Sequence, residues 1–139
     1  MSKNILAIET ATNVCSVSLF KKGEFVHEYS SNETRSHAKK LPVFVDDILK
    51  NNEMVAKELH GIAVSLGPGS YTGLRIGTSL AKGIALSLSL PLIPINTLDA
   101  LCVGLTEYSE FWICLYSHRD YVFAQKFNGN APVNNAVCL

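Results

Sequence analysis

The stretch that decides the fold runs from an apolar segment through a glycine-rich turn directly into a helical pattern: Ser65-Leu66-Gly67-Pro68-Gly69-Ser70-Tyr71-Thr72-Gly73-Leu74-Arg75-Ile76-Gly77. Gly67 and Gly69 permit a left-handed backbone and the close approach of a neighbouring group. Pro68 stiffens the bend, and Ser70 or Thr72 is placed to cap the helix that follows. The sequence therefore predicts a strand, a tight turn and a helix in immediate succession.

The predicted helix carries a stripe of small residues that recur every four positions and drift by only about 40° per step. Each interior glycine costs roughly 1 kcal/mol relative to alanine, and the close approach of another backbone is the usual compensation. Two interpretations are open: tight packing within the monomer, or an interface with another subunit. The interface is favoured, and it combines the stripe with an apolar helical face upstream: Leu41, Phe44, Val45, Gly73, Gly77, Ala81 and Ala85.

Composition limits the classes of function. The chain has 139 residues, enough for one core or for one domain plus a fragment of another. Lysine and arginine together number 12, as do aspartate and glutamate, so the basic excess of an autonomous nucleic-acid binder is missing. The four cysteines have neither zinc-ligand nor close pairing spacing, and the start of the chain does not resemble a signal peptide. We expect a cytoplasmic protein that does not cross a membrane.

Hydrophobic periodicity predicts strands and helices in alternation. The expected strands are 5–8, 15–20, 24–30, 62–66 and 92–95, followed by a hairpin of 112–115 with 121–127. The expected helices are one over 41–49 with Ser36 as a candidate cap, a short one over 54–60, one over 72–89, and one capped by Thr97 that runs to about residue 105. This order predicts an α/β fold with a mixed five-stranded sheet flanked by helices, the lobe plan of RNase H-like and actin-like ATPase folds. Residues 1–107 would form this first lobe, and residues 108–139 a truncated, incomplete second lobe.

Four segments carry a family resemblance: Ile8–Thr12, Ser36–Pro42, Gly61–Gly77 and Asn96–Leu101. In order and spacing they resemble the bacterial TsaB (YeaZ) proteins across residues 4–105. The resemblance implies a non-catalytic assembly subunit that dimerises with and positions the catalytic subunit TsaD, which attaches threonylcarbamoyl to the adenosine next to the tRNA anticodon. It also implies pairing through helices of the first lobe, the ATPase TsaE as a further partner, and contact with tRNA only through the complex. A homodimer could use the same surface.

A candidate phosphate or partner contact comprises Thr10, Thr12, Gly67, Gly69 and Arg75. The turn after Glu9 takes the place where actin-like ATPases carry an acidic residue and a glycine for the phosphate, but that glycine is missing. The alternative is that the two threonines only satisfy hydrogen bonds of the turn and that the arginine is solvated. We expect no cofactor of the chain's own, with ATP or ADP bound only at the interface with the partner.

Metal binding is not expected, because the four histidines are scattered and no two share a ligand spacing. His37 alone lies in a family motif, with a capping or surface role favoured over a partner contact.

The family's second lobe is only partly recognisable: the segment Tyr116–Asp120 keeps Arg119 of the usual pattern. The residues to Leu139 could pack on the first lobe, swap with a neighbour or represent a shortened protein. The competing functional hypothesis is an enzyme of the actin-like fold, either a nucleotide-binding phosphotransferase or a glycoprotease-type peptidase.

Overall fold

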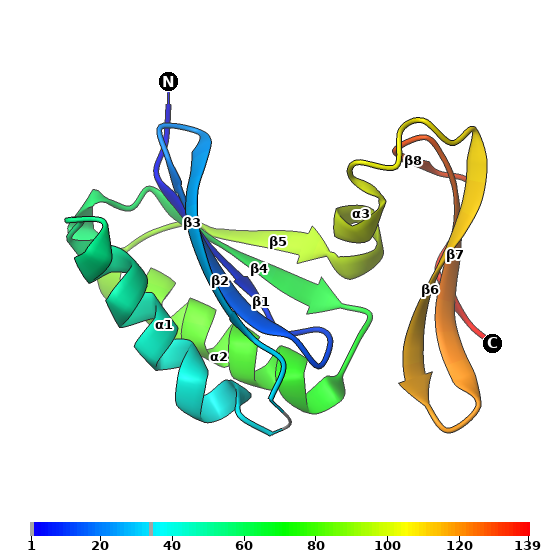
Figure 1. Cartoon of the computed structure of the whole chain (residues 1–139), viewed down its shortest axis with the longest axis horizontal. Helices are drawn as coiled ribbons and strands as arrows, with labels where there is room; N and C mark the ends of the chain where they lie inside the picture. The colour runs from blue at the N-terminus through cyan, green and yellow to red at the C-terminus, as the bar shows by residue number, and fades with distance from the viewer. Residues whose placement is uncertain (1, 34) are drawn as a thin grey trace.

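A computed structural model of the chain describes residues 2–33 and 35–139. A mixed sheet forms the centre of its first two thirds. Strands β1 (Ile5–Glu9), β2 (Cys15–Lys21) and β3 (Glu24–Ser31) form an antiparallel meander. Strand β1 also pairs in parallel with β4 (Gly61–Gly67), which pairs in parallel with β5 (Leu92–Asn96). The resulting order, β3-β2-β1-β4-β5, confirms the predicted RNase H-like or actin-like lobe (Figure 1).

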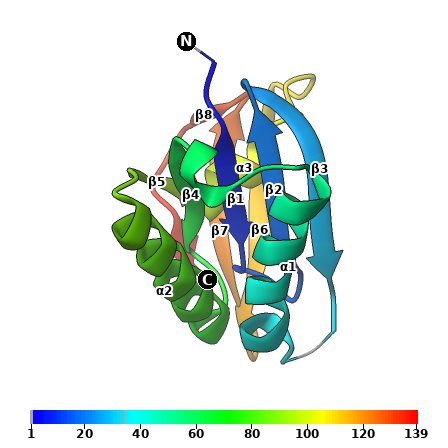
Figure 2. The same cartoon turned by 90° about the vertical axis from the view of Figure 1, so that its left-hand side faces the viewer.

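Two helices, α1 (His37–Asn51) and α2 (Tyr71–Leu88), cover one face of this sheet (Figure 2). Their apolar faces meet alternate side chains of β1, β2 and β4, because successive strand residues point to opposite faces. The core is built from wholly buried aliphatic residues, among them Leu6, Val17, Leu19, Leu41, Ile48 and Ile62. No helix in the described part of the chain is long and apolar enough to cross a bilayer.

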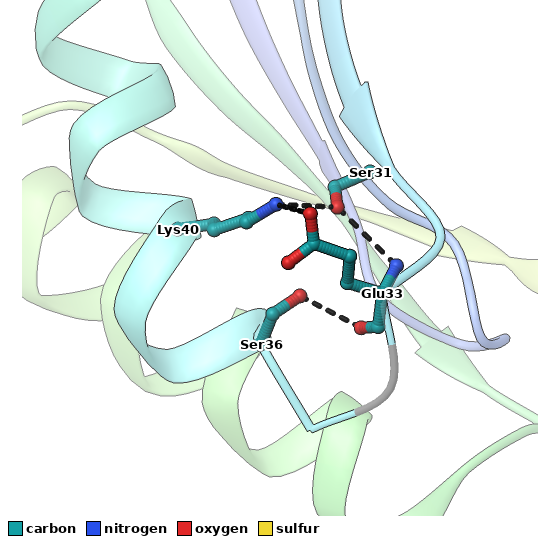
Figure 3. A network of polar contacts seen from close by, with 4 residues as sticks. All are labelled: Ser31, Glu33, Ser36 and Lys40. Carbon is teal, nitrogen blue, oxygen red and sulfur yellow. Dashed lines mark hydrogen bonds and ion pairs between the residues drawn. The ribbon is translucent and has the colours of Figure 1, made fainter.

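The connection from β3 into α1 is held by a small polar network (Figure 3). The Lys40 ammonium lies 2.7 Å from the Glu33 carboxylate and donates to the Ser31 hydroxyl at 3.0 Å. Ser36 occupies the N-cap position as predicted, but its hydroxyl donates to the Glu33 carbonyl oxygen at 2.7 Å instead of accepting from a helix N–H. The network thus fixes the entry to α1 without a side-chain cap.

The predicted helix over 54–60 is wrong in extent. Only one 3₁₀ turn, η1 (Ala56–Glu58), forms there. Val55 and Leu59 on either side adopt extended backbone, with ψ angles of 147° and 146°, so the turn cannot propagate in either direction. The segment serves as a connection into β4.

Helix α3 (Thr97–Cys102) follows β5 without a loop, and its cap differs from the prediction. Asn96, not Thr97, is the N-cap, since its side-chain oxygen accepts from the backbone N–H groups of Leu98 and Asp99 at 2.9 and 3.1 Å. The helix ends at Cys102, short of the expected residue 105.

A second, smaller sheet lies beyond α3 (Figure 1). Its hairpin of β6 (Glu110–His118) and β7 (Tyr121–Asn128) confirms the predicted one, while the short strands β8 (Ala131–Pro132) and β9 (Val137–Cys138), both paired with β7, had no periodic signal. One face of the hairpin packs on α3 through a cluster of buried residues: Leu98, Cys102, Ile113 and Phe127. The division into domains at residue 107 stays a prediction.

Candidate functional site

The glycine-rich turn between β4 and α2 rests on the loop that joins β1 to β2. Gly67 has a φ of +112°, which glycine adopts without strain. The backbone N–H of Ser70 donates to the Ala11 carbonyl at 2.7 Å, and a Cβ on Gly69 would collide with Ala11. Ser70 caps α2, as one of the two predicted candidates, because its hydroxyl accepts from Gly73 N–H at 3.1 Å.

The stripe of small residues on α2 faces the chain's own sheet, which corrects the interface prediction. All four of its members are buried: Gly73, Gly77, Ala81 and Ala85. A Cβ on Gly73 would overlap the Thr10 carbonyl oxygen, and one on Gly77 the Thr10 hydroxyl. The glycines make room for Thr10, which directly follows β1 of the same chain, so they offer no surface to a second polypeptide.

The predicted interface residues of α1 also contribute mainly to the monomer. Leu41 is completely buried, and Phe44 and Val45 are half-buried against the core. The Phe44 ring stacks on Tyr29 with the ring centres 5.9 Å apart. What remains accessible on this side is the outer surface of α1 and α2, where the two helices meet.

That surface is hollowed by a groove of about 510 Å³ between α1 and α2. Its lining is mostly apolar: Ala38, Leu41, Pro42, Thr72, Arg75, Ile76, Ser79 and Leu80. Among the described residues that line it, Arg75 is the only charged one, and its guanidinium carbon lies 5.5 Å from the centre of the Tyr71 ring. The groove is thus an accessible surface between the two helices, unlike the buried stripe.

A second hollow, of about 790 Å³, separates the glycine-rich turn from the second sheet. Thr12, Gly67 and Gly69 line it, as does β6 through Tyr116 to His118. Sequence reasoning missed the contribution of β6, because pairing between such distant segments leaves no local signal. We call this hollow the inter-sheet cleft.

Two of the candidate phosphate contacts do not reach this cleft. Thr10 is completely buried beneath α2, and Arg75 lines the groove between the helices. Thr12 does line the cleft, but its hydroxyl accepts from Val14 N–H at 3.1 Å. The structure thus brings together three of the five predicted residues, Thr12, Gly67 and Gly69.

Two backbone N–H groups of the loop after β1 are bonded to side chains of the same loop region. The Glu9 carboxylate accepts from the backbone N–H of Ala11 at 2.6 Å and from the Ser65 hydroxyl. A phosphate-binding loop needs free N–H groups directed at the anion. Here the acidic side chain and Thr12 already occupy two of these donors.

His37 lies at the start of α1 and is only 9% exposed. Its Nε2 is 3.0 Å from the Thr12 carbonyl oxygen, so the imidazole links α1 to the loop after β1. This contact lies within the chain and is neither the expected cap nor a surface position.

Among the described residues, no three histidine, cysteine, aspartate or glutamate side chains gather as a metal site would require.

Comparison with known proteins agrees with this geometry. Residues 25–117 match the family described as "TsaD: tRNA N6-adenosine threonylcarbamoyltransferase". With the sheet order, this match defines the class: an RNase H-like or actin-like α/β protein related to the threonylcarbamoyltransferases.

Three relatives narrow the assignment. The tRNA threonylcarbamoyladenosine biosynthesis protein TsaB of Haemophilus influenzae is 38% identical over 106 residues, 76% of this chain and 44% of that protein. The TsaB of Buchnera aphidicola subsp. Acyrthosiphon pisum is 35% identical over 133 residues, 94% of this chain and 60% of that protein. The solved structure of YeaZ from Pseudomonas aeruginosa superposes with a TM-score of 0.86 at 25% identity, covering 100% of this chain and 67% of that one. The chain belongs to the TsaB (YeaZ) family.

The chain spans about half the length of the curated relatives that it matches. The superposition on YeaZ covers the whole chain, and thus includes the first sheet with α1 and α2 and the groove between these helices.

Proposed function

We propose that this chain is a non-catalytic assembly subunit that pairs with a TsaD-type transferase and positions it for threonylcarbamoylation of the adenosine next to the tRNA anticodon. The names of the relatives support the pathway, since they are biosynthesis proteins for threonylcarbamoyladenosine in tRNA. The observation that carries the proposal is the groove between α1 and α2.

The groove suits a helix of a partner subunit. Its floor is apolar, its rim carries the small residues Ala38 and Ser79, and Arg75 offers one cation to a partner carboxylate. Small rim residues permit close helix packing, and an apolar centre with a polar rim is the usual anatomy of an interface. Arginine adds orientation, because its planar fork binds a carboxylate with two hydrogen bonds.

We further propose that the subunit has no nucleotide of its own and that ATP or ADP binds only where the partner completes a site. The loop after Glu9 supports this, because the N–H groups of Ala11 and Val14 are already used within the chain. The balanced charge supports contact with tRNA through the complex rather than directly. Assembly with a TsaE-type ATPase and a cytoplasmic location complete the proposal.

The test fills the groove without touching the core. Ala38→Trp and Ser79→Trp each place a bulky ring at an exposed rim position. We expect each to weaken binding to a purified TsaD at least tenfold in calorimetric titration and to lower tRNA modification in a reconstituted assay accordingly. Val55→Trp is the matched control, because Val55 is 64% exposed and lies outside the groove.

Unchanged affinity for TsaD in both groove variants, with folding verified by circular dichroism, would contradict the proposed surface.

A separate measurement addresses the alternative that the chain is itself an enzyme. Steady ATP hydrolysis by the isolated chain with magnesium, at a rate well above a heat-denatured sample, would favour an autonomous phosphotransferase over an assembly subunit.

A further inference from the structure

The helices α1 and α2 begin at the same end of the molecule, beside the loop that joins β1 to β2 (Figure 2). A hollow of about 430 Å³ lies between the two beginnings, and we call it the helix-start hollow. Its polar lining comes from three segments: Thr12 and Asn13 of the loop, Arg35 and His37 at α1, and Ser70 and Thr72 at α2.

Both helices leave backbone donors unused at this hollow. The first four N–H groups of an α-helix have no partner within the helix. Helix α1 has no side-chain cap, because the Ser36 hydroxyl donates to the Glu33 carbonyl instead. In α2 the Ser70 hydroxyl accepts from only one such group, the N–H of Gly73. Neither first turn contains an acidic residue, so no carboxylate there offsets the positive end of the helix dipole.

The side chains around the hollow add positive charge and further donors. Arg35 contributes a guanidinium, and none of the described residues that line the hollow is acidic. The Glu33 carboxylate, two positions before Arg35, lies 2.7 Å from the Lys40 ammonium. Asn13 adds an amide and Thr72 a hydroxyl, both of which can donate hydrogen bonds. The electrostatic character of the hollow is therefore that of an anion site.

The imidazole of His37 points independently to a ligand. It lines the hollow although it is only 9% exposed. Its Nε2 donates to the Thr12 carbonyl at 3.0 Å, because a carbonyl oxygen can only accept. Within residues 2–33 and 35–139, the other ring nitrogen, Nδ1, has no hydrogen-bond partner. An anion beside this buried ring would favour a proton on Nδ1, which then becomes one more donor.

We propose that the helix-start hollow binds one terminal phosphate group, either inorganic phosphate or the end of a small phosphate ester. Helix N-termini bind phosphate through their free N–H groups and their dipole, and arginine binds it with a planar fork of donors. Here two helix beginnings and Arg35 supply such donors from separate segments. A carboxylate or a backbone phosphodiester offers only two charged oxygens, so neither uses the donors as fully as a terminal phosphate does.

The experiment titrates the isolated, ¹⁵N-labelled chain of 139 residues with sodium phosphate at pH 7, with chloride keeping the ionic strength constant. Two-dimensional NMR should show saturable shifts of the N–H signals in the first turns of α1 and α2, with a Kd on the order of 1 mM. Glycerol 3-phosphate should shift the same signals. Whichever of the two probes binds more tightly identifies the free ion or an ester as the source of the phosphate.

Two variants test the residues. Arg35→Gln should weaken phosphate binding at least fivefold. Arg119→Gln is the matched control and should leave it unchanged, because Arg119 is also exposed but lies in the turn between β6 and β7. Ala38→Asp places a carboxylate in the first turn of α1, at the hollow, and should abolish phosphate binding. The same spectra verify that each variant is folded.

Several results would overturn this proposal. Shifts that grow linearly without saturation would indicate an adventitious ion only, and equal shifts with sodium acetate would exclude a site for phosphate. Unchanged affinity in Arg35→Gln would exclude the hollow as the site. A short RNA with a 5′-hydroxyl end that shifts the same signals at lower concentration than phosphate would assign the hollow to a nucleic-acid backbone. None of these measurements involves TsaD, so their outcome is separate from that of the proposed function.

Discussion

The hydroxyl of Thr10 occupies the space where a Cβ of residue 77 would lie, so Thr10 and Gly77 fit together only because residue 77 has no side chain. Both residues are buried, Thr10 completely. The end of β1 and the first half of α2 therefore approach more closely than a helix with ordinary side chains allows. The helix propensity lost at the glycines is offset within this chain.

Two glycines of α2 should respond oppositely to the same substitution. Gly77→Ala forces a methyl group into Thr10 and should lower the free energy of unfolding by about 1–3 kcal/mol. Gly83→Ala meets nothing within 4 Å and should raise it by about 1 kcal/mol through helix propensity. Urea denaturation of the two variants beside the parent chain measures both effects.

A double variant checks the cause. If the loss comes from contact with Thr10, then Gly77→Ala combined with Thr10→Ala should cost clearly less than the sum of the single changes, because the two sites share one space. Strict additivity would show that Thr10 is not the obstacle.

The cap of α3 provides a second prediction. Asn96→Ala removes the acceptor for two backbone N–H groups and should cost about 1 kcal/mol. Thr97→Val removes a buried hydroxyl that has no hydrogen-bond partner, so stability should stay the same or rise slightly. Thermal denaturation of both variants tests this, and the reverse ranking would restore Thr97 as the cap.

Buried thiols should make the fold sensitive to alkali. Burial raises the pKa of Cys15, an effect that Lys40 partly opposes, and burial together with Asp99 raises the pKa of Cys102. In the unfolded chain both thiols ionise near pH 8.5. Above that pH the unfolded state gives up protons that the folded state keeps, so stability should fall as pH rises toward the folded-state pKa values. At neutral pH and below, this contribution is fully present.

The measurement compares how steeply the free energy of unfolding falls with rising pH in each protein, rather than its value at one pH. The free energy of unfolding is determined by urea titration at several pH values from 7 to 10. Cys15→Ala should flatten the alkaline decline, and Cys114→Ala, at an exposed position, should leave it as in the parent. Equal slopes in all three proteins would rule out the buried thiol as the source.

Local patterns were enough to predict most of the first sheet and its helices. The alternation in β2, the 3.6-residue period of α1 and the glycine-rich turn before α2 are each encoded in a short window. Errors were concentrated at ends and caps, for example at Asn96 and Val55, where one residue in extended backbone decides whether a turn continues.

The candidate site was harder to predict, for a different reason. The stripe of small residues shows that some other backbone must approach the helix closely. The sequence does not say whether that backbone belongs to the same chain. Gly77 and Thr10 are 67 positions apart, and nothing local connects them. The same holds for the inter-sheet cleft, to which β6 contributes Tyr116 and His118 from far along the chain.

Helix α3 follows directly on the first sheet in the chain, yet the buried cluster that holds Leu98 and Cys102 is completed by Ile113 and Phe127 of the second sheet. A fragment ending at residue 107 would therefore keep its five strands but lose the cover of this short helix. Such a fragment would expose Leu98 and Cys102 to solvent and tend to aggregate. The smallest unit that stays monodisperse for crystallography or labelling must therefore include the β6–β7 hairpin.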